Sequence, residues 1–181
     1  MNKPQIILLD TNVVVDVLLN RENAIYTNRI IELAIDDEAI ECVTTTTVTD
    51  IHYLYKKYSD PKLTGYEVQD KLRDLLYILD MLPVTAKDVF NALECKWSDL
   101  EDALQYCVAV ANGCDCIITN NTKDFENPQI EVISPKDFID RYLGKGNQGG
   151  DDGNQDGTES FGHKEEQEEN EPHFPEFPGD D

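Results

Sequence analysis

The sequence predicts a three-layer α/β/α domain over residues 1–143, built on a central, mostly parallel sheet of four to five strands, and a disordered acidic tail over residues 144–181. Short unbroken apolar runs, typical of strands buried on both faces, alternate with longer segments whose apolar residues recur at helical spacing. Because strands separated by helices pair in parallel, helices are expected on both faces of the sheet. The tail is predicted from its composition of Gly, Asn, Gln, Asp and Glu, with almost no aliphatic residues.

Four apolar segments predict strands, and a brief extended piece at residues 82–84 would supply a fifth. The four segments are residues 5–9, 40–43, 116–119 and 130–133. The first of them ends directly before Asp10. Because ligands bind at the carboxyl ends of strands in such sheets, Asp10 is the residue around which a site is expected.

Helical spacing of apolar residues predicts the helices between these strands. The first is expected from residue 12 to about 37, with a break at 20–23, and the next follows the threonine-rich segment 44–49 and ends at residue 58. The others are expected over 63–81, over 86–96, from 98 to a C-terminal Gly113, and over 135–143. Thr47 with Asp50, and Ser98 with Glu101, have the spacing of capping boxes that open helices. Ser134 and Pro135 suit the N-cap and first position of the last helix.

The charge of the chain is strongly negative, with 15 basic and 37 acidic residues and a net charge of −22. The tail holds 12 acids and two bases, a net charge of −10, which leaves −12 on residues 1–143. Such a surface repels nucleic acid, so a phosphodiester substrate would need local basic residues, metal ions or an adaptor. One hypothesis is that the tail competes with RNA for basic residues between Lys56 and Arg73.

Five cysteines occur, with no Cys-x-x-Cys pair and no secretory leader. Free, buried thiols in a reducing cytoplasm are therefore expected. No apolar run approaches the roughly 20 residues that span a bilayer, so no membrane association is expected.

Acidic residues recur near the predicted strand ends and helix starts. Asp10, Asp50, Asp102 and Asp124 would face one crevice in a doubly wound sheet, and four oxygen donors there suit Mg²⁺ or Mn²⁺. Each acid has an alternative explanation, because Asp50 and Asp99 would also favour helix N-termini electrostatically and Asp124 could be an ordinary loop acid. Glu101, Asp115 and Glu126 are assigned to solvent or local structure.

Three segments carry a family resemblance. Residues 7–12 (Ile-Leu-Leu-Asp-Thr-Asn), 99–106 (Asp-Leu-Glu-Asp-Ala-Leu-Gln-Tyr) and 117–125 (Ile-Ile-Thr-Asn-Asn-Thr-Lys-Asp-Phe) resemble the PIN-domain family, in its order and at about its spacing. The similarity spans roughly residues 5–140 and is nearest in character to the VapC-type toxin ribonucleases. It implies a metal-dependent endoribonuclease with a compact PIN-like α/β fold.

The resemblance also assigns residues. Asp10 matches the family's first acid, Asp102 matches the acid of the central helix, and Asp50 stands where the family usually has Glu. Asn121 stands at a position that is often Asp, so either Asn121 or Asp124 would complete the site. By the same resemblance, Thr11, Asn12 and Thr119 match positions that orient the carboxylates. Asp99, one turn before Asp102 on a nearby face, is expected to support the site.

Three hypotheses about function stay open at this point. The first is a Mg²⁺- or Mn²⁺-dependent endoribonuclease, with RNA as substrate, an antitoxin protein as partner and a homodimer expected by analogy. The second is a PIN-like domain with a weakened or lost nuclease site that acts as a binding or regulatory module. The third is a metal-dependent phosphatase with Asp10 as nucleophile; it is disfavoured because such enzymes usually carry an Asp-x-Asp motif, whereas this chain has Asp10-Thr11-Asn12.

Overall fold

A computed structural model describes residues 4–36 and 38–146 of the chain. The tail predicted for residues 144–181 lies outside the described residues from position 147 onward. The last helix ends at Gly146 rather than at Leu143, so the first residues assigned to the tail belong to a helix. No described helix is long and apolar enough to cross a membrane.

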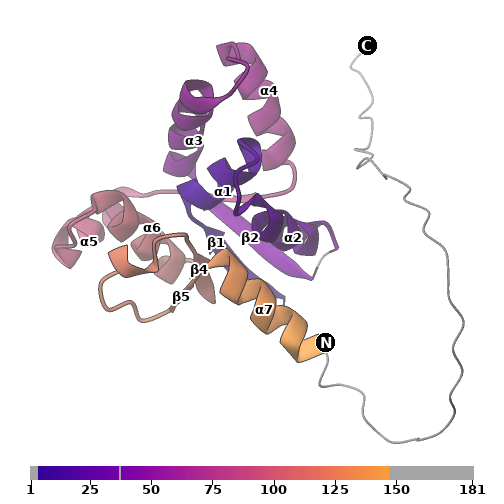
Figure 1. The fold of residues 1–181 in the computed structure, drawn as a ribbon. Coiled ribbons are helices and arrows are strands. Elements are labelled where there is room, and N and C mark those ends of the chain that lie inside the picture. Colours follow the sequence, from indigo (N-terminus) through magenta and orange to yellow (C-terminus); the bar gives the residue numbers. More distant parts are fainter. Residues whose placement is uncertain (1–3, 37, 147–181) are drawn as a thin grey trace, which may run out of the picture. The chain divides into compact units, whose positions relative to one another are not determined.

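Five parallel strands form the central sheet of the described part, in the spatial order β3-β2-β1-β4-β5. Figure 1 labels β1, β2, β4 and β5 of this sheet. The strands are β1 (Gln5–Leu9), β2 (Ala39–Thr44), β3 (Asp80–Leu82), β4 (Cys116–Ile118) and β5 (Glu131–Ile133). This confirms the predicted fold class. The order reverses between β1 and β4, because the chain first adds β2 and β3 on one side of β1 and later adds β4 and β5 on the other. The crevice at the carboxyl ends of β1 and β4 is therefore the expected ligand site.

Helices connect the strands and cover both faces of the sheet. They are α1 (Thr11–Leu18), α2 (Ala24–Ile35), α3 (Thr45–Tyr58), α4 (Gly65–Leu76), α5 (Ala86–Cys95), α6 (Leu100–Ala111) and α7 (Pro135–Gly146), with a 3₁₀ turn at Thr122–Asp124. The helix expected over 63–81 is shorter than predicted, because Asp80 to Leu82 pair with β2 as an edge strand. The extended piece predicted at 82–84 thus lies slightly earlier, within the sheet.

Two predicted helix caps are wrong. Thr44, the last residue of β2, caps α3 by accepting a hydrogen bond from the backbone N–H of Thr47, at 3.2 Å. Asp99 rather than Ser98 caps α6, accepting from the N–H groups of Glu101 at 2.8 Å and Asp102 at 3.4 Å. An aspartate at the N-cap satisfies the free amides of the first turn, which leaves the glutamate two residues later available for other contacts.

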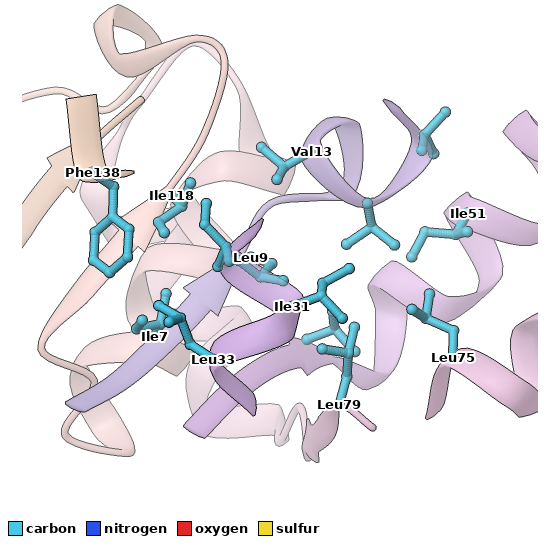
Figure 2. Close-up of a cluster of buried hydrophobic side chains, with 14 of the residues drawn as sticks. Ile7, Leu9, Val13, Ile31, Leu33, Ile51, Leu75, Leu79, Ile118 and Phe138 are labelled. Atoms are coloured by element: carbon cyan, nitrogen blue, oxygen red, sulfur yellow. The ribbon is translucent and has the colours of Figure 1, made fainter. Parts of the chain in front are cut away.

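The core divides between the two faces of β1. Ile7 and Leu9 point to the face covered by α1, α2 and α7 and join a large cluster that continues into α3 and α4 (Figure 2). Leu8 points to the opposite face, where it packs with Ala109 of α6 and Phe125. All three strand residues are fully buried, which explains why this segment has no polar alternation.

The cysteines of the described part are free, as expected from the sequence. Cys42, Cys107, Cys114 and Cys116 are buried, and Cys95 is partly buried. Burial raises the pKa of the Cys42 thiol to about 12 and that of Cys114 to about 11. The Cys42 and Cys114 thiols are therefore protonated core residues rather than nucleophiles.

Candidate active site

Asp10 lies at the carboxyl end of β1, at the point where the strand order reverses, and is only 3 % exposed. Its two carboxylate oxygens are held from two other elements. Thr119, directly after β4, donates from Oγ1 to Oδ2 at 2.8 Å, and Gln105 of α6 donates from Nε2 to Oδ1 at 3.0 Å. The position and orientation of this carboxylate are thus fixed by side chains that are distant in sequence.

Burial raises the pKa of Asp10, because a carboxylate removed from water loses its hydration. The hydrogen bonds from Thr119 and Gln105, and those from the backbone amides of Thr11 and Asn12, act in the opposite direction and offset the effect in part. Asp10 is therefore a buried acid that is well supplied with donors. A cation near it would stabilise its ionised form further.

Asp102 is partly buried in the first turn of α6. Burial is the largest cause that raises its pKa to about 7, and the negative charges of Asp10, Asp99, Asp124 and Glu101 raise it further. These four acids therefore lie near enough to act on one carboxyl group. Asp124 itself is exposed in the 3₁₀ turn after β4.

The assignment of Glu101 to solvent or local structure, which the sequence suggests, is wrong. Although the residue as a whole is exposed, its Oε1 accepts a hydrogen bond from Thr11 Oγ1 at 2.8 Å. Burial raises the pKa of Glu101, followed by the charges of Asp50, Asp10 and Asp99. The side chain thus turns toward the crevice. The capping-box pattern with Ser98 conceals this role, because it gives Glu101 a local explanation.

Asp50 lies in the second turn of α3, not in the first turn as expected, because the helix begins at Thr45. The residue is partly buried, and burial raises its pKa. Its charge is the largest carboxylate contribution to the raised pKa of Glu101, so the two acids lie near enough to interact electrostatically. The structure therefore brings Asp50 near the same group of acids.

The remaining predicted residues have different surroundings. Thr11 and Thr119 are buried and bond to Glu101 and Asp10, as residues that orient carboxylates would. Asn121 is exposed, and its backbone N–H donates to Thr119 Oγ1 at 3.0 Å. Asn12 is also exposed and reaches Asp10 through its backbone amide.

Sequence reasoning misses two polar residues near the site. Gln105 is 1 % exposed and donates to Asp10, and its position four residues after Glu101 and three after Asp102, on the same face of α6, is a signal that could have identified it. Asp16 of α1 is 5 % exposed and accepts hydrogen bonds from Asn120 Nδ2 at 2.8 Å and from Arg21 Nη1 at 3.2 Å. It lies within a run of valines and leucines that predicts only core packing.

The donor chemistry of this crevice fits a hard divalent cation. Among the described residues, no three His, Cys, Asp or Glu side chains lie close enough together to hold one metal ion as they stand. The site nevertheless offers carboxylates, the ligands that Mg²⁺ and Mn²⁺ prefer, and the charges of neighbouring acids raise the pKa of Glu101 and of Asp102. A bound cation would remove this mutual repulsion, which is the physical reason to place one here.

Comparisons with known proteins bear on the family and the fold of this chain. A profile of the PIN domain matches residues 6–123. Ribonuclease VapC1 of Aquifex aeolicus (strain VF5) is 28 % identical over 142 residues, and the match covers 75 % of this chain and 94 % of that protein.

Solved structures with the same fold include VapBC2 from Rickettsia felis bound to a promoter DNA fragment, with a TM-score of 0.55 and 22 % identity over 72 % of this chain and 98 % of that one. A toxin–antitoxin complex from Klebsiella pneumoniae matches with a TM-score of 0.51 and 21 % identity, over 71 % of this chain and 96 % of that one. At 22 % and 21 % identity, these structures support the fold of this chain and nothing further. Because the PIN profile covers most of the folded part, the chain belongs to the PIN domain family.

Proposed function

We propose that this chain is a Mg²⁺- or Mn²⁺-dependent endoribonuclease and the toxin of a toxin–antitoxin pair. The observation that carries the proposal is the buried Asp10 carboxylate, held by Thr119 and Gln105 beside Asp102 at the reversal point of the sheet. The similarity to Ribonuclease VapC1 supports the ribonuclease activity. The alternative is a PIN-like domain whose nuclease activity is weakened or lost.

Each acid has a proposed role. Asp10 and Asp102 would hold the cation directly, with Asp50 and Asp124 assisting and Glu101 added by its position beside Thr11. When bound, such a cation neutralises charge on the phosphate and activates the attacking water. Thr119 and Gln105 keep the Asp10 carboxylate in place while this happens, because they bond its two oxygens separately.

The proposed function implies an RNA substrate and a protein partner. RNA would be the substrate, and cleavage would leave a 5′-phosphate and a 3′-hydroxyl. An antitoxin protein is the proposed partner, supported by the similarity to a structure described as a toxin–antitoxin complex. A homodimer and a cytoplasmic location remain part of the proposal.

The test is cleavage of RNA by the purified chain with Mg²⁺ or Mn²⁺, with EDTA as a control for the cation. Asp10→Asn and Asp102→Asn should each lower the rate by about 100-fold or more, since each removes a charged ligand. Asp74→Asn is the matched control, because Asp74 is an exposed acid of α4. Equal cleavage by all three variants would contradict the proposal, and no cleavage by the folded wild-type chain under any of these conditions would favour the alternative.

A further inference from the structure

A cluster of aromatic and basic side chains lies toward the C-terminal end of α3. The Lys57 ammonium nitrogen lies 5.3 Å from the ring centre of Tyr53 and 5.0 Å from that of Tyr58. The guanidinium carbon of Arg21 lies 5.9 Å from the Tyr58 ring centre. Both rings stay open to solvent, since Tyr53 is 60 % exposed and Tyr58 is 50 % exposed. We call Arg21, Tyr53, Lys57 and Tyr58 the α3 patch.

The helix itself connects the α3 patch to the acidic crevice. Asp50, Tyr53 and Lys57 are spaced by three and four residues, so their side chains follow one another along one face of α3. At the rise of an α-helix, Tyr53 lies about 4.5 Å and Lys57 about 10.5 Å along the axis from Asp50. The patch therefore begins one helical turn from an acid of the site.

A second series of contacts reaches the patch from the other side of the crevice. Thr119 bonds Asp10, and the next residue, Asn120, donates to Asp16 at 2.8 Å. Asp16 in turn accepts from Arg21 at 3.2 Å, which fixes Arg21 near Tyr58. Because Asp16 neutralises part of the Arg21 charge, Lys57 supplies most of the positive charge of the patch.

We propose that the α3 patch binds a nucleotide of a single-stranded RNA that lies next to the two nucleotides joined by the cleaved bond. A base would stack on the exposed ring of Tyr53 or Tyr58, and Lys57 would contact a neighbouring phosphate. This inference rests on the proposed ribonuclease function. It explains how RNA could bind beside the site although the folded part of the chain repels it. Residues 1–143 carry a net charge of −12, so RNA needs a local cationic surface beside the site.

The surface chemistry favours RNA over a purely apolar partner. A cation that lies over two tyrosine rings offers charge and stacking area together, which is the combination that single-stranded nucleic acid uses. Tyr66 of α4 provides a contrast, because it is 81 % exposed and lies outside this cluster. It is therefore a suitable control for the loss of an exposed tyrosine alone.

The experiment measures binding of a fluorescently labelled single-stranded RNA to the full chain by anisotropy, in an Asp10→Asn background that prevents cleavage. Adding Tyr53→Ala or Lys57→Ala should weaken binding by roughly tenfold, whereas Tyr53→Phe, which keeps the ring, should bind like the background. Lys57→Ala should also lower the slope of log affinity against log salt by about one. Tyr66→Ala and Lys87→Ala, an exposed lysine of α5, serve as controls.

Cleavage assays separate this inference from the proposed function. In the wild-type background, the patch variants should raise KM for a long RNA but cleave a dinucleotide at the wild-type rate, since a dinucleotide is too short to reach the patch. RNA affinity equal to that of the controls would overturn the inference, while cleavage by the wild-type chain would leave the ribonuclease function standing. Absence of cleavage by the wild-type chain would count against the function, whereas the binding comparison would still decide the role of the patch.

Discussion

Glu41 gives the most sharply defined prediction about stability. It is a β2 residue that is 1 % exposed, and neither of its carboxylate oxygens has a hydrogen-bond partner within the described part of the chain. It pairs in register with Ile7, so its side chain shares the face of the sheet that carries the large apolar cluster. Burial raises its pKa from 4.5 to about 7.

The direction of the pH effect follows from this raised pKa. Between pH 4.5 and pH 7 the unfolded chain loses the Glu41 proton while the folded chain keeps it, so ionisation favours the unfolded state. The stability linked to Glu41 is complete below pH 4.5, falls as the pH rises, and is lost above about pH 7. At about 1.4 kcal/mol per pH unit, the loss amounts to about 3 kcal/mol.

Glu41→Gln isolates this effect, because the amide has nearly the same shape and does not ionise. Measured by urea unfolding, the variant should be about as stable as wild type near pH 4.5 and about 3 kcal/mol more stable at pH 8. Glu94→Gln, at an exposed site on α5, should show no such pH-dependent gain. A difference between Glu41→Gln and wild type that stays constant from pH 4.5 to pH 8 would refute the reasoning, since it would mean that Glu41 ionises normally in the folded chain.

Two further predictions concern the candidate site. Because the pKa of Asp102 is about 7, protons compete with the cation for this carboxylate below that pH. The Mn²⁺ affinity measured by calorimetry should therefore rise with pH up to about 7 and then level off. An affinity that does not change between pH 5 and pH 7 would contradict this prediction. Gln105→Leu removes the donor to Asp10 and should lower RNA cleavage about tenfold, whereas Gln105→Glu, which adds a negative charge beside Asp10, should lower it more. Wild-type activity of Gln105→Leu would show that Gln105 does not position Asp10.

Much of the fold could be predicted because its signals are local. The unbroken apolar run before Asp10 specifies a strand buried on both faces, and the alternation of strands with helices specifies a parallel sheet. The end of α4 could not be predicted in this way. Its apolar periodicity continues beyond Leu76, and only pairing with β2 converts Asp80 to Leu82 into a strand.

The same distinction applies to the site. Asp10 was identifiable because a strand end marks it, whereas the role of Gln105 depends on how α6 packs against β1. Ser98 and Glu101 have the spacing of a capping box, but Asp99 occupies the N-cap and so frees Glu101 to accept from Thr11. The capping-box spacing allows Glu101 either to cap the helix or to point elsewhere. Its hydrogen bond with Thr11, 90 positions earlier in the chain, shows that it takes the second arrangement.

Asp50 shows how the departure from the family's usual Glu bears on activity. Its side chain is one methylene shorter, which would move its carboxylate back by about 1 Å or more along an extended chain. Even so, its charge contributes more to the raised pKa of Glu101 than that of Asp10 does, so the shorter side chain still lies close enough to act on an acid beside the crevice. Glu101, whose Oε1 accepts a hydrogen bond from Thr11, adds a longer carboxylate side chain to the same group of acids. Asp50 therefore stays within the group of acids proposed to hold the cation, despite its shorter side chain.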